Sequence, residues 1–347
     1  MKLLQQRHTS VAKCCFLLSF IATRITGFLI GYSSLLGNQR SSQPSRRQPR
    51  FSKDALFRDD DDGTSPRIDP FLALAMEESL VKIQILMATT TETANPKSYY
   101  GLSSWKKLWK DCCELVQVDQ STVPNAGLGL LANTNLEEGT VVSFYPVHGI
   151  GMDHTSTGGT TAAIASTNDV DQDFFDTQQD QDGRNYRQCL LRPLTGYSTT
   201  IRGKEKLFID VNPHRSVHPG WTSHCVNDGA TILPQPQGYQ EEQVLTYYEQ
   251  SLQKQNCVQI PFGPVPLMAT VTTRAVDAGE ELFTCYGAAY WLPVVGDPNH
   301  VPKLLASPGI LKSIDHSACL TRESIQKVSA RYDKEWAGIE ESFLAAF

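Results

Sequence analysis

The sequence predicts an α+β fold that is mostly β, with helices flanking the strands. Short β-prone segments separated by turn residues fill 114–145, and strand signals return at 188–192 and 207–211. A further β-prone run, a turn at 277–279 and an apolar aromatic segment follow one another within 271–291. Taken alone, this last stretch predicts a hairpin whose aromatic side chains either fill a core or line a site.

Composition limits the classes of function. The 347 residues suffice for one large domain or two modest ones. An apolar fraction of 40% is compatible with a packed core, and the formal net charge of -6 gives no general attraction to nucleic acid, so we expect no direct nucleic-acid binding. The same mild acidity is compatible with a basic protein substrate and is also ordinary for a globular protein.

The cysteines predict neither a zinc site nor a disulfide framework. No two of the nine have the Cys-x-x-Cys spacing of a zinc site, and their number is odd. We therefore expect no bound metal. They occupy positions 14, 15, 112, 113, 189, 225, 257, 285 and 319.

Residues 1–53 have the composition of a targeting segment. They contain nine lysines and arginines and no aspartate or glutamate, around an apolar run at 14–23 that Arg24 interrupts. This run is too short to cross a bilayer, so we expect no stable membrane span. A presequence for a plastid or mitochondrion is our first interpretation, and a secretory signal, a membrane anchor or a disordered basic tail are the alternatives. Residues 54–67 include four consecutive aspartates and predict a disordered linker.

Helical signals predict an N-terminal extension at 68–110. The pair Asp69-Pro70 is typical of a helix start, and apolar spacing continues to about Met87. Trp105 and Trp109, four residues apart, predict a second short apolar face in the same extension.

Other signals lie after the first strands. Residues 149–183 are rich in Gly, Thr, Asp and Gln and predict a flexible insertion. Residues 241–253 predict a helix, and 261–266 predict a rigid proline connector. Thr321 is predicted to cap a last helix through about Ala345, within a C-terminal helical extension at 293–347.

Three stretches follow one another in an order that is typical of one family. Residues 125–145 read NAGLGLLANTNLEEGTVVSFY, residues 219–230 read PGWTSHCVNDGA, and residues 279–291 read GEELFTCYGAAYW. Together they resemble the SET-domain protein-lysine methyltransferases. The resemblance implies a SET fold of several small curved sheets with a threaded C-terminal segment, and a SET domain at 111–292. It also implies S-adenosyl-L-methionine as cofactor and a protein substrate that presents a lysine.

Methyl transfer to lysine needs a cradle for the cofactor and an apolar aromatic channel, because the amine, with a pKa of about 10.4, must be uncharged to react. By resemblance, the turn Gly127-Leu128-Gly129 contacts the amino-acid end of the cofactor, and its glycines let the main chain approach closely. By the same resemblance, the main chain of the loop at 223–227 would contact the adenine, with either His224 or Asn227 as the main contact. The cofactor-binding candidates are therefore Gly127, Leu128, Gly129, Ser223, His224, Cys225, Asn227 and Trp291.

The catalytic candidates are Tyr286 and Tyr145. By resemblance, the hydroxyl of Tyr286 orients the methyl group and the amine without acting as a full base. Tyr145 would line the lysine channel and Trp291 would stack on the adenine, and core packing is the alternative for both. Glu281 is predicted to hold a loop in place by accepting hydrogen bonds. Cys285 has no base visible in the sequence and is not a candidate nucleophile.

The chain departs from the family in two places. Ser223 stands where the family has asparagine, and the cysteine-rich zinc segment that often follows the Tyr-Gly motif is absent from 292–302. These departures favour a second interpretation, a catalytically inactive SET module that binds a peptide or a partner protein. A methyltransferase that acts on another group than lysine is a third. The motifs leave open the substrate protein, the number of methyl groups added and the oligomeric state.

Overall fold

The computed structural model describes residues that all belong to one compact unit, 49–340, of the two into which the chain divides. The predicted targeting segment and linker lie outside them, as do 339–347. The described ranges are 70–89, 103–154, 161–166, 188–189, 205–212, 218–232, 239–263, 267–295 and 301–338. None of the helices in these ranges is both long and apolar enough to cross a membrane.

Within the described ranges, helices α3 (Pro70–Thr89) and α4 (Ser103–Leu115) precede the sheets, in the region predicted to be a helical extension, although α4 continues past the predicted end at 110. The helical spacing of Trp105, Leu108 and Cys112 places these three side chains on one buried face of α4. The Trp105 ring contacts that of Phe144 with centroids 4.7 Å apart, so α4 packs against the strand that carries Phe144.

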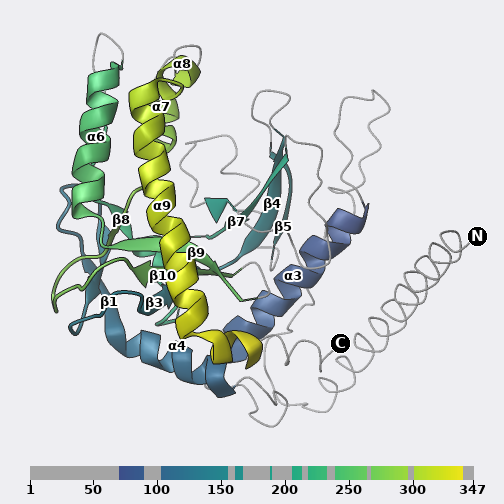
Figure 1. Cartoon of the computed structure of the whole chain (residues 1–347). Coiled ribbons are helices and arrows are strands. Elements are labelled where there is room, and N and C mark those ends of the chain that lie inside the picture. Colours follow the sequence, from purple (N-terminus) through teal and green to yellow (C-terminus); the bar gives the residue numbers. More distant parts are fainter. Residues whose placement is uncertain are drawn as a thin grey trace, which may run out of the picture. The chain divides into compact units, whose positions relative to one another are not determined.

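The strands of the described ranges form four small sheets, which confirms the predicted α+β class (Figure 1). Two sheets have two strands each, one antiparallel (β1-β2) and one parallel (β8-β11), a third has the order β3-β10-β9, and the fourth β5-β4-β7-β6. The strands of the first three sheets are β1 Val116–Gln120, β2 Leu128–Ala132, β3 Val141–Phe144, β8 Asn227–Asp228, β9 Cys257–Phe262, β10 Leu267–Thr272 and β11 Phe283–Thr284. The strands of the fourth are β4 Gly149–His154, β5 Thr161–Ser166, β6 Gln188–Cys189 and β7 Glu205–Asp210.

The fourth sheet corrects the prediction of a flexible insertion at 149–183. Its first two strands, β4 and β5, lie inside that segment, and the remainder outside the described residues. All six residues of β4 pair with β7, whose sequence lies more than 50 residues away. Residues 149–154 therefore become extended through a distant partner, which local periodicity does not reveal.

The stretch 271–291 is not the hairpin that was predicted. Strand β10 ends at Thr272 and pairs with β3 and β9, whereas β11 pairs in parallel with β8. Between them, the chain bonds to β2 and to the turn that follows it. Val276 N donates to Leu136 O at 3.0 Å, Leu136 N donates to Val276 O at 2.8 Å, and Leu282 N donates to Leu130 O in β2 at 2.7 Å. The turn is present, but each side of it has other partners.

Helix α6, which spans Glu241–Lys254, comes before β9. The described helices after β11 are α7 Ala288–Val295, α8 Val301–Leu305 and α9 Pro308–Arg331, and 333–338 are helical again. Helix α6 lies against α7 and α9 (Figure 1). The prediction that Thr321 caps the last helix is wrong. The cap is Ser307, whose side chain accepts from Ile310 N at 3.4 Å, and Thr321 lies inside α9, where its hydroxyl donates to Ser317 O.

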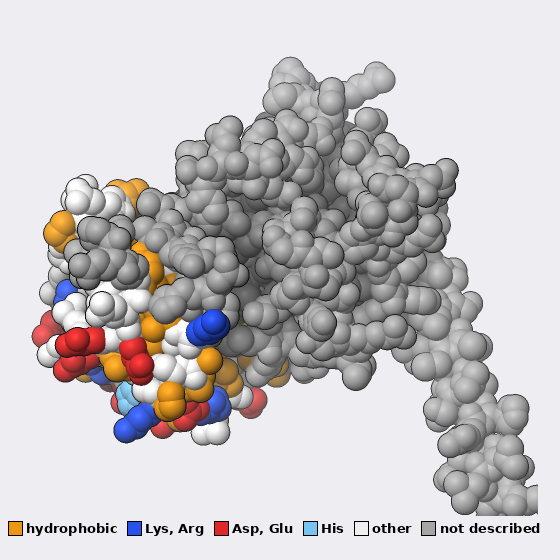
Figure 2. Space-filling view, turned by 90° about the horizontal axis from the view of Figure 1, so that it is seen from above, with side chains coloured by type: hydrophobic (Ala, Val, Ile, Leu, Met, Phe, Trp, Pro, Cys, Tyr) orange, Lys and Arg blue, Asp and Glu red, His pale blue; other side chains and the backbone are white. Residues whose placement is uncertain are grey.

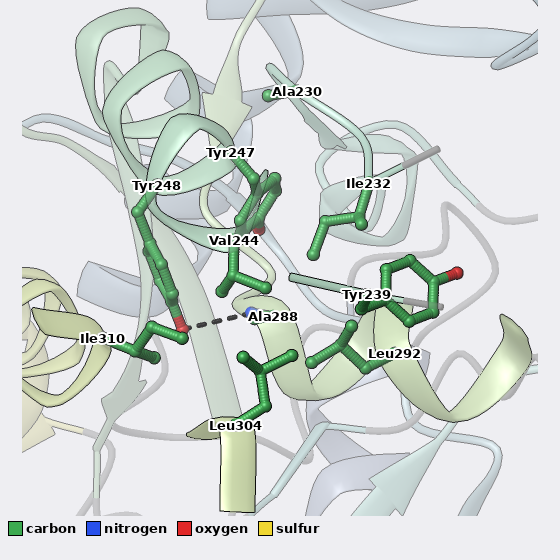
Figure 3. Packing of buried hydrophobic residues seen from close by; sticks show 10 residues of the cluster. All are labelled: Ala230, Ile232, Tyr239, Val244, Tyr247, Tyr248, Ala288, Leu292, Leu304 and Ile310. Atoms are coloured by element: carbon green, nitrogen blue, oxygen red, sulfur yellow. Dashed lines mark hydrogen bonds between the residues drawn. The ribbon is translucent and has the colours of Figure 1, made fainter. Parts of the chain in front are cut away.

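A hydrophobic cluster joins α6 to α7 and to the start of α9 (Figure 3). The side chain of Tyr248 points from α6 toward Ala288 and Ile310. The cluster comprises Ala230, Ile232, Tyr239, Val244, Tyr247, Tyr248, Ala288, Leu292, Leu304 and Ile310. It gives the segment after β11 a rigid support.

Candidate functional site

The candidate site begins at the loop between β1 and β2. Gly127 is exposed and has a φ of 78°, a left-handed conformation that favours glycine, and a Cβ placed there would meet no atom within 4 Å. Leu128 follows with 58% of its surface exposed. This corner of the loop is therefore open to a ligand.

Gly129 is a glycine for a different reason. It is buried, and an added Cβ would collide with the carboxylate of Glu281. The close approach that this glycine permits is thus an approach of Glu281, within the protein. The prediction treated both glycines as one cofactor turn, but only Gly127 faces open space.

Glu281 is 3% exposed, and its carboxylate accepts hydrogen bonds from three residues. Ser121 Oγ and Asn227 Nδ2 donate to Oε1 at 2.7 and 3.1 Å, and the amide of Thr122 donates to Oε2 at 2.6 Å. We call this set, Glu281 with Ser121, Thr122 and Asn227, the Glu281 clamp. It confirms the prediction that Glu281 holds a loop in place, and the loop is the one that carries Gly127.

Asn227 links the β1–β2 loop to the second motif. Its Nδ2 donates to Leu128 O at 2.9 Å and lies 3.1 Å from Ser121 Oγ, in addition to its bond with Glu281. The side-chain amide protons of Asn227 are therefore used within the protein. Leu128 and Asn227, two predicted cofactor-binding residues, are brought into direct contact.

The loop before Asn227 is a short 3-10 helix, η2, at Ser223–Cys225. Ser223 is fully buried, and its hydroxyl accepts from Thr270 Oγ1 at 2.7 Å, so this residue holds η2 against β10. Burial lowers the pKa of His224 to about 4 and raises the pKa of Cys225 to about 11. At neutral pH this loop thus presents a neutral imidazole and a protonated thiol.

Tyr286 follows β11 and lies beside η2. Its hydroxyl donates to Val226 O at 2.6 Å, one residue before Asn227. Its ring contacts Tyr290 at a centroid distance of 4.7 Å and stacks on Trp291 at 6.3 Å with planes 20° apart. The three aromatic residues form one partly exposed group, in which Tyr290 is 39% exposed.

Tyr145 occupies a more interior position than the channel role implies. It is 2% exposed, its amide donates to Met268 O at 2.9 Å, and its ring meets that of His224 edge to face at 6.4 Å. Its surroundings favour the alternative of core packing. Trp291 is half-buried, and its indole N–H donates to Asp228 at 3.1 Å.

Asp228 was not predicted as a site residue. It is 3% exposed and accepts hydrogen bonds from both Tyr286 N and Trp291 Nε1. In the sequence it reads as one more polar residue in a Gly-containing loop, and no motif distinguishes it. Within the described ranges, no group of three His, Cys, Asp or Glu side chains is arranged to hold a metal ion.

Comparison with known proteins adds distant likenesses only. No family model and no curated protein matches the chain. Among solved structures, CpSET8 from Cryptosporidium is 12% identical, with a TM-score of 0.28, over 75% of this chain and 91% of that one. The ATXR5 SET domain in complex with histone H3 is 13% identical, with a TM-score of 0.30, over 65% and 96%. The SET domain of the RIZ1 tumor suppressor is 13% identical, with a TM-score of 0.24, over 66% and 95%.

Proposed function

We propose that the chain is an S-adenosyl-L-methionine-dependent methyltransferase that acts on a lysine side chain of a protein substrate. The observation that carries the proposal is the meeting of three sequence-distant motifs. Val226 accepts from the Tyr286 hydroxyl, and the next residue, Asn227, binds Leu128 O and Glu281. The motif order resembles the SET family, and the contacts join the same three motifs in space.

The residues near these contacts suit the proposed cofactor. Gly127 and Leu128 offer an exposed main-chain corner, and the rings of Tyr286, Tyr290 and Trp291 offer apolar faces. The two nearby carboxyl groups, of Glu281 and Asp228, are buried and hydrogen-bonded within the protein, and burial keeps the His224 imidazole neutral. In the proposal, the main chain at Gly127 and the 223–227 loop hold the cofactor, which supplies an activated methyl group.

The hydrogen bond of Tyr286 defines what its hydroxyl can do. The single hydroxyl proton is donated to Val226 O, so toward any further group in the site the oxygen acts as an acceptor. The tyrosine oxygen can accept a hydrogen bond from an N–H of the incoming amine. This bond would orient the lone pair of the amine nitrogen toward the methyl donor. Tyr286 would therefore position the amine, and loss of the amine's proton would follow from the apolar surroundings.

A specific observation favours the alternative, an inactive module that binds a peptide or a partner protein. The side-chain amide of Asn227 and the hydroxyl of Ser223 both bond within the protein. If the main chain of this loop also failed to bind adenine, the site would retain an aromatic surface without a cofactor.

Calorimetric titration separates the two functions. S-adenosyl-L-methionine would be titrated into the full chain and into Tyr286→Phe, with Asp315→Asn, an exposed change on α9, as the control. The enzyme predicts saturable binding by all three and, on arrays of lysine-containing peptides, methyl transfer that Tyr286→Phe reduces at least a hundredfold. No detectable binding by the folded wild-type chain would exclude the proposed enzyme and leave the binding module.

A further inference from the structure

Asp228, the last residue of β8, is a buried carboxylate at which three segments meet. Two of its hydrogen-bond donors are side chains of α6, two belong to the segment that follows β11, and one is an amide of its own turn. The five donors are Tyr247 OH at 2.5 Å, Ser251 Oγ at 2.5 Å, Tyr286 N at 3.0 Å, Trp291 Nε1 at 3.1 Å and Ala230 N at 3.2 Å.

None of these five donors carries a charge, so dipoles alone stabilise the carboxylate. Burial raises the pKa of Asp228, and the hydrogen bonds from Ser251, Tyr247 and Trp291 oppose that rise. Hydrogen bonds to an ionised acceptor are shorter and stronger than those between neutral groups. Replacing one carboxylate oxygen by an amide nitrogen would therefore weaken several of these bonds at once.

Residues 286–288 present three successive backbone amides to this network. Tyr286 N donates to Asp228, Gly287 N donates to Tyr247 OH at 2.9 Å, and Ala288 N donates to Tyr248 OH at 3.1 Å, the bond that Figure 3 marks. Amides at the start of a helix have no partner within the helix, and α7 starts at Ala288. Side chains from β8 and α6 supply the missing acceptors and so determine where the Tyr286 backbone lies.

The same carboxylate also holds the partner ring of Tyr286. Trp291 donates its indole N–H to Asp228 Oδ2, the oxygen that accepts from Tyr286 N. The two rings stack with planes 20° apart. One oxygen atom therefore sets the relative position of the two aromatic residues.

We propose that Asp228 is a positioning residue of the candidate site, which uses α6 to hold Tyr286 and Trp291 in a single arrangement. Its effect on ligand binding rests on the proposed function, because those two residues are the catalytic and adenine-stacking candidates. Its effect on how the rings of Tyr286 and Trp291 are arranged is independent of that function. Asp228 acts through its hydrogen bonds and needs no contact with cofactor or substrate.

Indole NMR signals test the arrangement without any ligand. The chain has five tryptophans, each with one indole N–H, and Trp291→Phe assigns the signal of interest. In Asp228→Asn we expect the Trp291 signal to move while the other four stay, and the same displacement, smaller, in Tyr247→Phe. Asp315→Asn should leave all five unchanged. A Trp291 signal that coincides with wild type in Asp228→Asn would overturn the proposal.

Titration with S-adenosyl-L-methionine tests the consequence for binding. We expect Kd to rise about tenfold in Asp228→Asn and less in Tyr247→Phe, and to stay constant in Asp315→Asn. Unchanged Kd in Asp228→Asn, against a wild type that binds, would contradict the positioning role. If wild type itself does not bind, the proposed function fails, and the indole signals alone decide on Asp228. If Asp228→Asn does not fold, Tyr247→Phe decides by the same two measurements, and an unmoved Trp291 signal there counts against the proposal.

Discussion

At the scale of single residues, the space that Gly129 leaves determines how Glu281 can be buried. A carboxylate needs donors when it leaves water, and the Glu281 clamp supplies them from a loop 160 residues earlier in the chain. That geometry requires the carboxylate to lie against the main chain of β2. A hydrogen atom at position 129 is the side chain that fits.

We therefore expect Gly129→Ala to destabilise the protein by about 1–3 kcal/mol, as overpacking of a buried site does. The added methyl group would push Glu281 away from Ser121 and Thr122. Urea unfolding measures the loss. In a Glu281→Asp background, whose carboxylate is one methylene shorter, the same Gly129→Ala change should cost less, and equal costs in both backgrounds would contradict the collision.

His224 predicts a pH dependence of stability. Its pKa in the folded chain is lowered to about 4 by burial, whereas the unfolded chain binds the proton near pH 6.5. Between these values the unfolded state holds more protons, so stability is fully present above about pH 6.5 and falls as pH decreases toward 4. Over this interval the free energy of unfolding falls by about 3 kcal/mol because of His224. In His224→Gln, the urea-unfolding midpoint should depend less on pH between 7 and 4.5 than it does in wild type. The same pH dependence in both proteins would contradict the buried neutral imidazole.

The role of a residue was predictable from sequence where its side-chain chemistry allows few roles. A glutamate between a turn and an apolar strand was expected to accept hydrogen bonds, and Glu281 does so. Asp228 and Gly129 were not understood from sequence, because their roles depend on which distant side chains approach them. Ser223 has a structural bond to Thr270, 47 residues later, that no local pattern indicates.

At the scale of elements, the residue that caps the end of α9, Tyr332, supports the β3-β10-β9 sheet. Val141 N, in β3, donates to the hydroxyl of Tyr332 at 3.0 Å, and the ring of Tyr332 meets that of Phe262 in β9 at 6.1 Å. Nearby, Lys327 pairs with Glu138 at the surface. The buried contact should matter more, since exposed ion pairs contribute little.

Tyr332→Phe should destabilise the chain by about 1–2 kcal/mol, because Val141 N would lose its acceptor while the ring packing remains. Lys327→Met, in the last turns of α9, should leave the unfolding midpoint close to that of wild type. Thermal and urea unfolding of both variants measure the difference. A larger effect of Lys327→Met than of Tyr332→Phe would mean that the surface pair, and not the buried hydroxyl, attaches α9.

Elements with strong local signals were predicted, and those that depend on pairing were not. The start of α3 at Pro70 and the helix at 241–254 follow from capping residues and apolar spacing. The cap of α9 was placed 14 residues late, at Thr321 instead of Ser307, because the proline and glycine at 308 and 309 obscure the helix start. β4 became a strand through β7, and the partners of β10 lie upstream of it.

At the scale of the whole molecule, the described surface shows mixed charge. Figure 2 shows acidic, basic and hydrophobic side chains interspersed over the described part of one face. This agrees with the modest net charge of -6. Specificity for a protein substrate would then depend on local contacts near the aromatic group, more than on a long-range field.

Two buried thiols test whether the described unit unfolds as one. Cys112 in α4 and Cys257 in β9 are both fully buried, and burial raises the pKa of each thiol. Only the thiolate reacts with iodoacetamide, so we expect both to react only through unfolding and hence at the same slow rate at pH 8. Peptide mass spectrometry reads the two rates, with the urea-unfolded chain as reference. Rates that differ widely would show that α4 and β9 open separately.

The Glu281 clamp also has a consequence for how the chain folds. It joins residues 160 positions apart, and the bond between Tyr286 and Val226 spans 60. Closing such long loops costs entropy before any contact compensates for it, so contacts of this kind form late and slowly. On a growing nascent chain, α4 and the β1–β2 hairpin can exist well before Glu281 has been synthesised. The candidate site would therefore mature late, and a chain arrested before Glu281 would carry its first motif without the residues that hold it.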